Sequence, residues 1–372
     1  LAAEIKKNLT IPVAATSVFR DPEFCDETLG SGAIDFVAMG RSWLADPEWG
    51  EKALSGRADD IRKCLGCMYC FETAGNALCT GEGHAQCSVN PYLGEETVYS
   101  APTEDGNGRK AVVIGGGPAG LEAALILAQR KFDVTLMEKE DRLGGQMYLS
   151  SLPPHRGKMG NFIKYAEKQL KDLGVDIRLN TEASAEAIKA MNPYAVFVCT
   201  GSVAVLPKSI PGIDGDNVYV ASDILTEKVK LIGKKIVVAG GGLTGMETAE
   251  FLQVKGNEVT DIDMLPGLGL GAFPLVVMDE TSRVAQSGVC AMPGHKLAEI
   301  HADHVVLEDT AGYQVTLPCD AVIMCLGVRP VNQLGEELTG VEHVYMLGDA
   351  KKSGRRVTNA IHEAFEVAYN LM

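Results

Sequence analysis

At 372 residues the chain is long enough for two or three domains, and its 46% hydrophobic and 22% charged residues are typical of a folded globular protein. The formal net charge of −15 argues against a nucleic-acid partner, because phosphates repel an acidic surface. The apolar runs are too short to cross a bilayer and the first residues lack the regions of a signal peptide, so a cytoplasmic protein with no membrane partner is expected.

The first fifty residues predict a βαβα segment. Apolar runs at 11–16 and 34–40 are typical of strands, and a helical pattern covers about 22–31 between them. Because the loops are short and strands alternate with helices, the two strands are expected to run parallel.

Five of the ten cysteines lie between residues 64 and 87. Cys64, Cys67 and Cys70 form a CxxCxxC loop, and Cys87 follows after sixteen further residues. Clustered thiols in a cytosolic protein indicate metal binding or redox chemistry rather than a disulfide framework. Three close thiolates and one remote thiolate suit a 4Fe–4S cluster. The spacing also permits a zinc site with four cysteine ligands, and Cys79 competes with Cys87 for the fourth position.

The stretch that follows, "NPYLGEETVYSAPTEDGNG", is polar and marked by Gly and Pro, as expected of a linker over a surface. The remaining cysteines mostly fall in apolar strand or helix patterns and are expected to pack as small hydrophobic residues. They are Cys25, Cys199, Cys290, Cys319 and Cys325.

The sequence "KAVVIGGGPAGLEAALILAQRKFDVTLMEKE" predicts a dinucleotide-binding cradle. An apolar strand turns at Gly115, Gly117 lets a pyrophosphate approach the backbone, and Gly120 lets the following helix pack closely on the strand. The start of that helix offers free N–H groups to the phosphates. Glu138 ends the next strand, where its carboxylate can bind a ribose hydroxyl.

The sequence "KKIVVAGGGLTGMETAEFLQVKGNEVTDIDML" repeats this design with Gly240, Gly242, Gly245 and Asp263. No Lys or Arg follows Asp263 closely to bind a 2′-phosphate, which favours NADH over NADPH and leaves NADPH as the alternative. Asp261, two residues earlier, is most simply a charge on an edge strand. Two cradles in one chain predict FAD in the first and a nicotinamide dinucleotide in the second.

Further motifs agree with a flavoprotein. The "RLGGQ" loop, from Arg142 to Gln146, follows the first cradle's acid and could bring its backbone against the flavin pyrophosphate. The "LGDA" motif ends a strand at Gly348 and Asp349, which are expected to lie over the ribityl and phosphate groups. A last helix is expected at about 357–371.

Two apolar strands that run into glycine suit crossings of the chain between two domains. They are "VFVCTGS" (196–202) and "VIMCLGVRP" (322–330).

These motifs, in this order, resemble the C-terminal part of the Old Yellow Enzyme family, in its NADH:flavin oxidoreductase branch with a 4Fe–4S cluster. Members include 2,4-dienoyl-CoA reductase, 2-enoate reductase, trimethylamine dehydrogenase and bile-acid oxidoreductases. The "SVNP" after Cys87 matches the family's own continuation and favours Cys87 over Cys79. The gap between Cys70 and Cys87 is longer than the family pattern and implies an insertion.

The resemblance implies that residues 1–50 are the last two βα units of a TIM barrel that binds FMN. Gly40 and Arg41 end the eighth strand in that pattern, where the family holds the FMN phosphate. After the seventh strand the family usually has glycine, whereas this chain has Thr16 and Ser17. A full barrel takes roughly 250 residues, so a longer protein that carries the substrate site upstream is expected.

The predicted fold is therefore α/β: the C-terminal end of a TIM barrel, an iron–sulfur linker and two Rossmann-like dinucleotide-binding domains. The barrel end covers 1–50 and the iron–sulfur segment covers 51–107. The FAD-binding domain covers 108–232 and 326–372, and the NAD(P)H-binding domain covers 233–325.

The resemblance implies an oxidoreductase in which electrons pass from NADH to FAD, the 4Fe–4S cluster and FMN, and reduce an activated C=C bond of a small-molecule substrate. Three alternatives stay open. One is oxidation of the trimethylamine dehydrogenase type, with ADP in place of FAD in the first cradle. Another is an electron-transfer module resembling the small subunit of glutamate synthase, and the third is a degenerate fragment. Self-association into a homo-oligomer also stays open.

Overall fold

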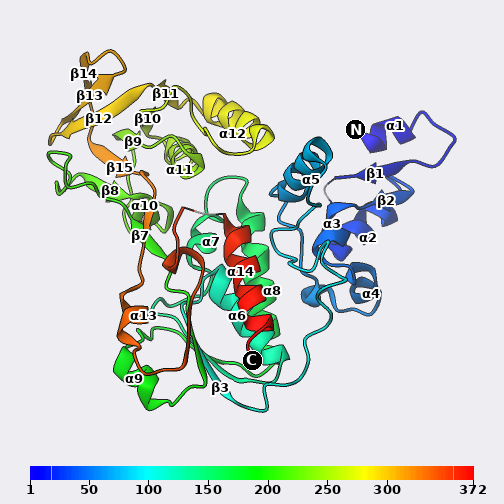
Figure 1. The fold of residues 1–372 in the computed structure, drawn as a ribbon. Coiled ribbons are helices and arrows are strands. Elements are labelled where there is room, and N and C mark those ends of the chain that lie inside the picture. The colour runs from blue at the N-terminus through cyan, green and yellow to red at the C-terminus, as the bar shows by residue number, and fades with distance from the viewer. Residues whose placement is uncertain (18, 355) are drawn as a thin grey trace.

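The computed structural model describes residues 1–17, 19–354 and 356–372. Three regions follow one another along the chain: an N-terminal segment, a first unit around strand β3 (Lys110–Ile114) and a second unit around strand β9 (Lys235–Ala239). Figure 1 shows the second unit above the first, with the N-terminal segment at the side.

In the N-terminal segment two short strands, β1 (Ala14–Thr16) and β2 (Phe36–Ala38), pair in parallel, as the βαβα pattern predicts. Both are shorter than the apolar runs that predict them. The helices of this segment are α1 (Ala2–Lys6), α2 (Pro22–Gly30), α3 (Arg41–Ala45) and α4 (Trp49–Leu54).

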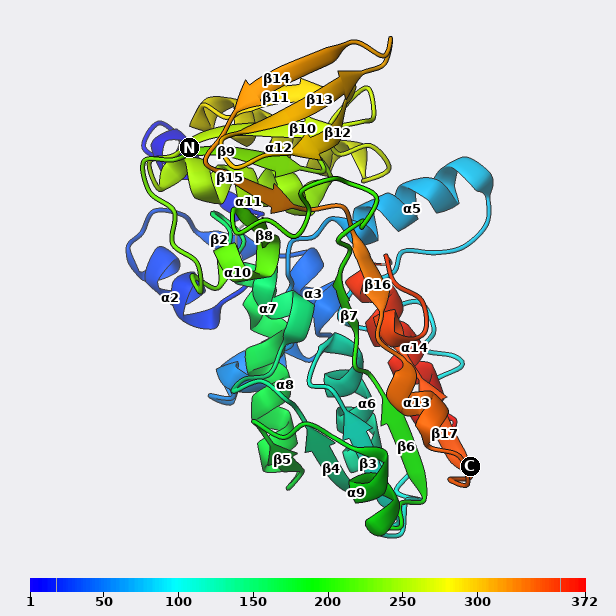
Figure 2. The ribbon, with the colours of Figure 1, turned by 90° about the vertical axis from the view of Figure 1, so that its left-hand side faces the viewer.

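The cysteine segment is the predicted iron–sulfur segment, residues 51–107, and it joins the N-terminal segment to the first unit. It contains the short 3-10 helix η1 (Ala58–Asp60) and helix α5 (Tyr69–Thr80), which projects from the body of the molecule in Figure 2. Left-handed backbone at Gly66 and Met68, each with φ of 65°, turns the chain sharply just before α5.

The first unit is a five-stranded parallel sheet in the order β17-β6-β3-β4-β5. Strand β3 is buried on both faces, as expected for a continuous apolar run in a parallel sheet. Its other strands are β4 (Asp133–Met137), β5 (Asp176–Arg178), β6 (Ala195–Val198) and β17 (His343–Met346). Its helices are α6 (Pro118–Gln129), α7 (Gly145–Leu149), η2 (Gly157–Gly160), α8 (Asn161–Asp172), α9 (Ala185–Ala190), α13 (Gln333–Glu337), η3 (Gly348–Ala350) and α14 (Val357–Tyr369).

The core of the first unit extends into the cysteine segment. Helix α6 packs along α14 and α8, and its apolar residues belong to one cluster of buried side chains. The same cluster includes Cys64, Leu65, Cys87 and Val89. The cysteine segment is therefore packed into the first unit and is not a loose linker between domains.

The second unit repeats the arrangement with a five-stranded sheet in the order β11-β10-β9-β15-β8. Its other strands are β8 (Val218–Val220), β10 (Glu258–Asp263), β11 (Cys290–Pro293) and β15 (Ala321–Met324), and its helices are α10 (Ala221–Leu225), α11 (Leu243–Val254) and α12 (Pro274–Ser287). An antiparallel sheet follows, made of β12 (His295–Ile300), β13 (His304–Asp309) and β14 (Gln314–Pro318).

The chain crosses between the units twice. Strands β7 (Ser202–Ala204) and β16 (Val328–Pro330) pair in antiparallel fashion at the crossing, within or next to the two stretches predicted as connections. Strand β8 pairs with β15, so the second sheet includes residues that precede the predicted start of that domain at 233. The side chains of Arg156 and Glu247 form an ion pair that also links the units.

Across the described part of the chain, no helix has both the length and the apolar character that a membrane crossing requires.

Candidate functional site

The four cysteines predicted as cluster ligands line one small cavity between the N-terminal segment and the first unit. Cys64 and Cys87 are buried, whereas Cys67 and Cys70 are partly exposed. Cys79 is exposed near the far end of α5, outside this lining. The geometry therefore favours Cys87 over Cys79 as the fourth ligand. The rest of the lining comes from Arg41, Leu44, Leu65, Met68, Ser88 and Val89.

Polar groups face two of these sulfur atoms. The backbone N–H of Gly66 donates to Cys64 Sγ at 3.3 Å. The hydroxyl of Ser88 lies 3.2 Å from Cys67 Sγ. Hydrogen bonds to sulfur stabilise a negatively charged thiolate and, in iron–sulfur sites, help set the reduction potential.

Burial makes a bare thiolate costly in this cavity. It raises the pKa of Cys87 to about 12, although backbone N–H groups of Val89 and Asn90 face the sulfur and oppose the shift. Burial also raises the pKa of Cys70. These thiols can ionise at neutral pH when they bind a cation, because a coordinated thiol loses its proton. The donor set therefore fits an iron–sulfur cluster.

In residues 1–17, 19–354 and 356–372, no three His, Cys, Asp or Glu side chains are arranged around a single metal ion. The four cysteines of a 4Fe–4S cluster surround a larger group, in which each sulfur binds a different iron. The identity of the bound group stays a prediction.

Helix α14 of the first unit contacts the cysteine segment directly. His362 Nε2 lies 2.7 Å from the carbonyl oxygen of Cys87. Thr358 Oγ1 lies 2.8 Å from Ser88 Oγ, and Ser88 in turn contacts Cys67. A group bound by these cysteines would therefore sit against the unit that carries the first cradle.

The three glycines of the first cradle each meet a steric requirement of a dinucleotide site. Gly115 has a φ of 98°, and a Cβ atom there would lie 2.4 Å from the carbonyl oxygen of Cys199. A Cβ atom on Gly120 would lie 1.9 Å from the carbonyl oxygen of Gly115, so helix and strand could not pack. Gly117, at the start of α6, faces open space within 4 Å. A pyrophosphate can approach the backbone there.

Glu138 and the "RLGGQ" loop both contact this glycine turn. Glu138 accepts a hydrogen bond from the N–H of Gly116 at 2.7 Å. The N–H of Gly144 donates to the carbonyl of Gly116 at 2.8 Å. A Cβ atom on Gly145 would lie 3.2 Å from the Cα of Gly117. The loop thus lies beside the open face of the cradle, where the flavin pyrophosphate is predicted.

The remaining residues predicted to bind FAD surround the same turn. Gly348 packs against α6, since a Cβ atom there would lie 3.2 Å from the Cβ of Ala119. Asp349 follows it in η3. Arg142 and Gln146 are exposed, one before α7 and one within it. Their contacts with FAD stay predictions.

The second cradle reproduces the first. Gly240 has a φ of 112°, a Cβ atom on Gly245 would lie 1.8 Å from the carbonyl oxygen of Gly240, and Gly242 faces open space. Asp263 accepts a hydrogen bond from the N–H of Gly241 at 2.7 Å. Each of these residues stands 125 positions after its counterpart in the first cradle. The residues present therefore fit a second dinucleotide.

The prediction that Asp261 is a charge on an edge strand is wrong. It is fully buried in β10, which lies between β9 and β11 and is not an edge strand. Among the described residues, neither carboxylate oxygen has a hydrogen-bond partner. Burial, with a smaller contribution from Asp263, raises the pKa of Asp261 to about 7. Its counterpart in the first unit is Leu136, which is equally buried.

The predicted FMN residues sit differently from the expectation. Strand β2 ends at Ala38, so Gly40 and Arg41 do not end a strand; Arg41 begins helix α3. Its guanidinium lies 3.0 Å from the sulfur of Met68 and 3.4 Å from the carbonyl oxygen of Ser17, on the wall of the cysteine cavity. A role in binding a phosphate stays a prediction.

Sequence reasoning missed a buried ion pair beside the cysteines. Arg62 Nη1 lies 3.2 Å from Glu122 Oε2, and Glu122 is fully buried within α6. The signal was one acid in the otherwise apolar run "LEAALILA", together with a basic residue two positions before Cys64. Neither feature belongs to a cofactor motif, so neither predicts a functional role by itself.

A sequence profile described as pyridine nucleotide-disulphide oxidoreductase matches residues 109–364, which is more than half of the chain. The chain belongs to this family. A family of this description supports FAD and NAD(P)H as the dinucleotides of the two cradles.

This oxidoreductase is also similar to larger enzymes over its whole length. It is 37% identical to an NADH oxidase of Thermoanaerobacter brockii, covering 100% of this chain and 57% of that protein. It is 34% identical to a bilirubin reductase of Mediterraneibacter gnavus, covering 98% of this chain and 56% of that protein. The chain thus spans a little over half the length of these relatives.

A solved structure of 2-naphthoyl-CoA reductase, in complex with 2-naphthoyl-CoA, shares the fold. It superposes with a TM-score of 0.92 at 30% identity, covering 99% of this chain and 56% of that one. These relatives confirm the resemblance to the Old Yellow Enzyme-like oxidoreductases that the motifs predict.

Replacing Cys87 should abolish binding of the predicted cluster, whereas replacing Cys79 should not. Cys87→Ser removes a buried donor from the cavity, and Cys79→Ser changes an exposed thiol outside it. The measurement is iron and acid-labile sulfide per chain after anaerobic purification. Normal iron in Cys87→Ser together with loss of iron in Cys79→Ser would reverse the assignment of the fourth ligand.

The wild-type protein should lose stability as the pH rises from about 4 to about 7 because of Asp261. The folded state keeps the proton up to a pKa of about 7, whereas the unfolded chain releases it near its ordinary value, so unfolding releases a proton in this window. The effect is up to about 4 kcal/mol in the free energy of unfolding.

Asp261→Leu copies the first unit and should reduce this pH dependence in urea unfolding curves, with buried Glu280, whose pKa is also raised to about 7, left to contribute the remainder. Glu258→Gln, which changes an exposed carboxylate on the same strand, is the control. An equally steep pH dependence in Asp261→Leu would show that Asp261 does not carry the proton.

Proposed function

We propose that this chain is the electron-input part of an NADH-dependent flavin and iron–sulfur oxidoreductase. In the proposed order, electrons pass from NADH to FAD, to a 4Fe–4S cluster and to FMN, and they reduce an activated C=C bond. The bound groups supply the redox chemistry, and the chain holds and orients them.

The observation that carries the proposal is the attachment of the cysteine-lined cavity to the unit of the first cradle. Four thiols from two segments face the same cavity, and α14 contacts the segment of Cys87 through Thr358 and His362. Gly115, Gly117 and Gly120 would hold FAD at the start of α6, and Cys64 is packed in the same core as that helix. This arrangement favours a relay over two unrelated sites.

The second cradle would hold the nicotinamide dinucleotide. Gly242 leaves the backbone open to a pyrophosphate, and Asp263 would accept hydrogen bonds from a ribose. Met264, the next residue, is 64% exposed and uncharged. This position therefore offers no cation to bind the 2′-phosphate of NADPH, which supports NADH.

The N-terminal segment supports the barrel part of the proposal. Strands β1 and β2 run parallel, as the seventh and eighth strands of a barrel would. Ser17 has a φ of 94°, in the range that favours glycine, at the position where the family usually has one. This segment argues against a separate electron-transfer module of the glutamate synthase type.

The substrate class is supported by relatives. Two of them are reductases by name, one of bilirubin and one of 2-naphthoyl-CoA. A reductase of a conjugated C=C bond is the common chemistry that we propose for the whole protein. The groups that bind and protonate the substrate would lie outside this chain.

Cys67→Ser tests the relay. NADH should still bleach the FAD absorbance of this variant at the wild-type rate, because both cradles lie outside the cysteine segment. Reduction of the cluster, or of FMN in a longer protein, should be lost. Anaerobic stopped-flow absorbance separates the two phases. Undiminished delivery of electrons beyond FAD in Cys67→Ser would contradict the proposed order.

Asp263→Ser combined with Met264→Arg tests the choice of nucleotide. The change removes the carboxylate that would bind the ribose and adds a cation beside it. The ratio of the NADH and NADPH dissociation constants should move at least about tenfold towards NADPH, as expected for a charged hydrogen bond. An unchanged ratio would show that Asp263 does not contact the ribose.

A further inference from the structure

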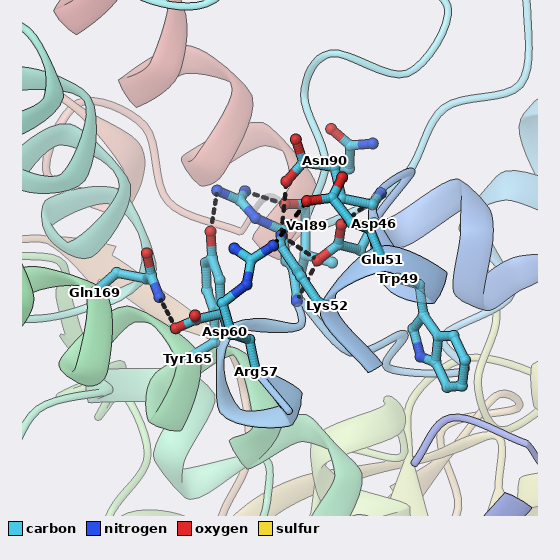
Figure 3. A network of polar contacts seen from close by, with 12 residues as sticks. Asp46, Trp49, Glu51, Lys52, Arg57, Asp60, Val89, Asn90, Tyr165 and Gln169 are labelled. Carbon is cyan, nitrogen blue, oxygen red and sulfur yellow. Dashed lines mark hydrogen bonds and ion pairs between the residues drawn. The ribbon is translucent and has the colours of Figure 1, made fainter. Parts of the chain in front are cut away.

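Arg62 and Glu122 form a buried ion pair between the cysteine segment and α6. Glu122 is fully buried, and its two carboxylate oxygens lie 3.2 Å and 3.3 Å from Arg62 Nη1. The guanidinium also lies 3.4 Å from the hydroxyl of Tyr165 and 4.9 Å from the centre of its ring. Figure 3 shows the surrounding network, including Tyr165 and Val89.

Arg62 contacts both segments that supply the cysteines. It stands two residues before Cys64, and its guanidinium donates a hydrogen bond to the carbonyl of Val89. That carbonyl and the N–H of Asn90 belong to the same peptide group. The N–H of Asn90 faces the sulfur of Cys87. A positive charge at the oxygen end of this peptide polarises it and strengthens the N–H···S interaction at the other end.

The charge of Arg62 is permanent. Burial opposes it, but Glu122 and Tyr165 outweigh burial and raise the pKa of the guanidinium. Burial also raises the pKa of Glu122, and the guanidinium opposes that shift. An arginine does not lose its proton in proteins. Glu122, with both carboxylate oxygens against the guanidinium, is the group placed to balance this charge.

A charge in this position acts on any cluster that the cysteines hold. A buried charge is screened far less than an exposed one. Positive charge and hydrogen bonds to sulfur both favour the reduced cluster, which is the more negative form. A carboxylate placed against the positive charge reduces that effect.

We propose that the Arg62–Glu122 pair sets the reduction potential of the cluster bound by Cys64, Cys67, Cys70 and Cys87. Arg62 is a positioning residue that acts through the peptide between Val89 and Asn90, and Glu122 is its balancing charge. This inference rests on the proposed function, because it requires the cluster.

The test is a redox titration of the anaerobically purified protein, followed by the electron paramagnetic resonance signal of the reduced cluster. Glu122→Gln leaves the charge of Arg62 unbalanced and should move the midpoint to a more positive potential. The expected shift is about tenfold in the ratio of reduced to oxidised cluster, which is about 59 mV for one electron.

The matched control is Glu51→Gln. Glu51 also pairs with an arginine, since Arg57 Nη2 lies 2.9 Å from its carboxylate, but both side chains are exposed. Solvent and salt screen such a pair. Its loss should leave the midpoint potential unchanged.

A second variant keeps the test decisive if Glu122→Gln does not hold a cluster. Arg62→Met combined with Glu122→Gln removes both buried charges, a change that proteins often tolerate. Arg62 contacts the Val89–Asn90 peptide, whose N–H faces the sulfur of Cys87, so the positive member of the pair is the one linked to a predicted cluster ligand. The double variant should therefore have a midpoint below that of the wild type.

The titration distinguishes failure of this inference from failure of the proposed function. A cluster signal with the same midpoint in the wild type and both variants would overturn the role of the ion pair and leave the relay intact. A wild-type protein with no iron–sulfur signal would overturn the relay and this inference together.

Discussion

The cysteine segment is packed into the core of the first unit, and this packing holds Cys64 and Cys87 against the unit that carries the first cradle. Cys64 and Cys87 share one apolar cluster with α6, α8 and α14, and the Arg62–Glu122 pair lies between the segment and α6. Leaving one charge of such a pair unbalanced costs about 3–5 kcal/mol. The position of the cysteines relative to the first cradle is therefore fixed by packing and charge together, as an electron relay requires.

The two cradles show how one backbone design serves two different ligands. The glycines and the acid have the same geometry in both units. In each, the acid accepts a hydrogen bond from the N–H of the second glycine of the turn, which is Gly116 in the first unit and Gly241 in the second. The differences lie around them. Asp261 is a buried carboxyl where the first unit has Leu136, and Met264 is exposed and apolar where the first unit has Lys139. Selectivity between flavin and nicotinamide dinucleotides must come from such surroundings, because the cradle itself does not differ.

The sequence was sufficient wherever a backbone geometry demands particular residues. Gly115 and Gly240 require left-handed backbone, so both cradles and the crossings beside them could be predicted. The Arg62–Glu122 pair could not, because it joins residues sixty positions apart that belong to no motif. Asp261 was misjudged for a related reason: the period of a strand shows which face a residue occupies, but not whether the strand lies at an edge. Strand β8 precedes the predicted boundary at 233 and joins the second sheet only through a long-range pairing with β15, which no local pattern indicates.

We propose that the cysteine-lined cavity holds an iron–sulfur cluster next to a flavin. The most direct measurement is the content of iron, acid-labile sulfide, zinc and released flavin per chain after anaerobic purification. About four irons and four sulfides with FAD are predicted, as a 4Fe–4S cluster held by four cysteine thiolates requires. Zinc in place of iron would make the cavity a structural metal site, contradict the relay, and leave an NADH-dependent flavoprotein without a cluster.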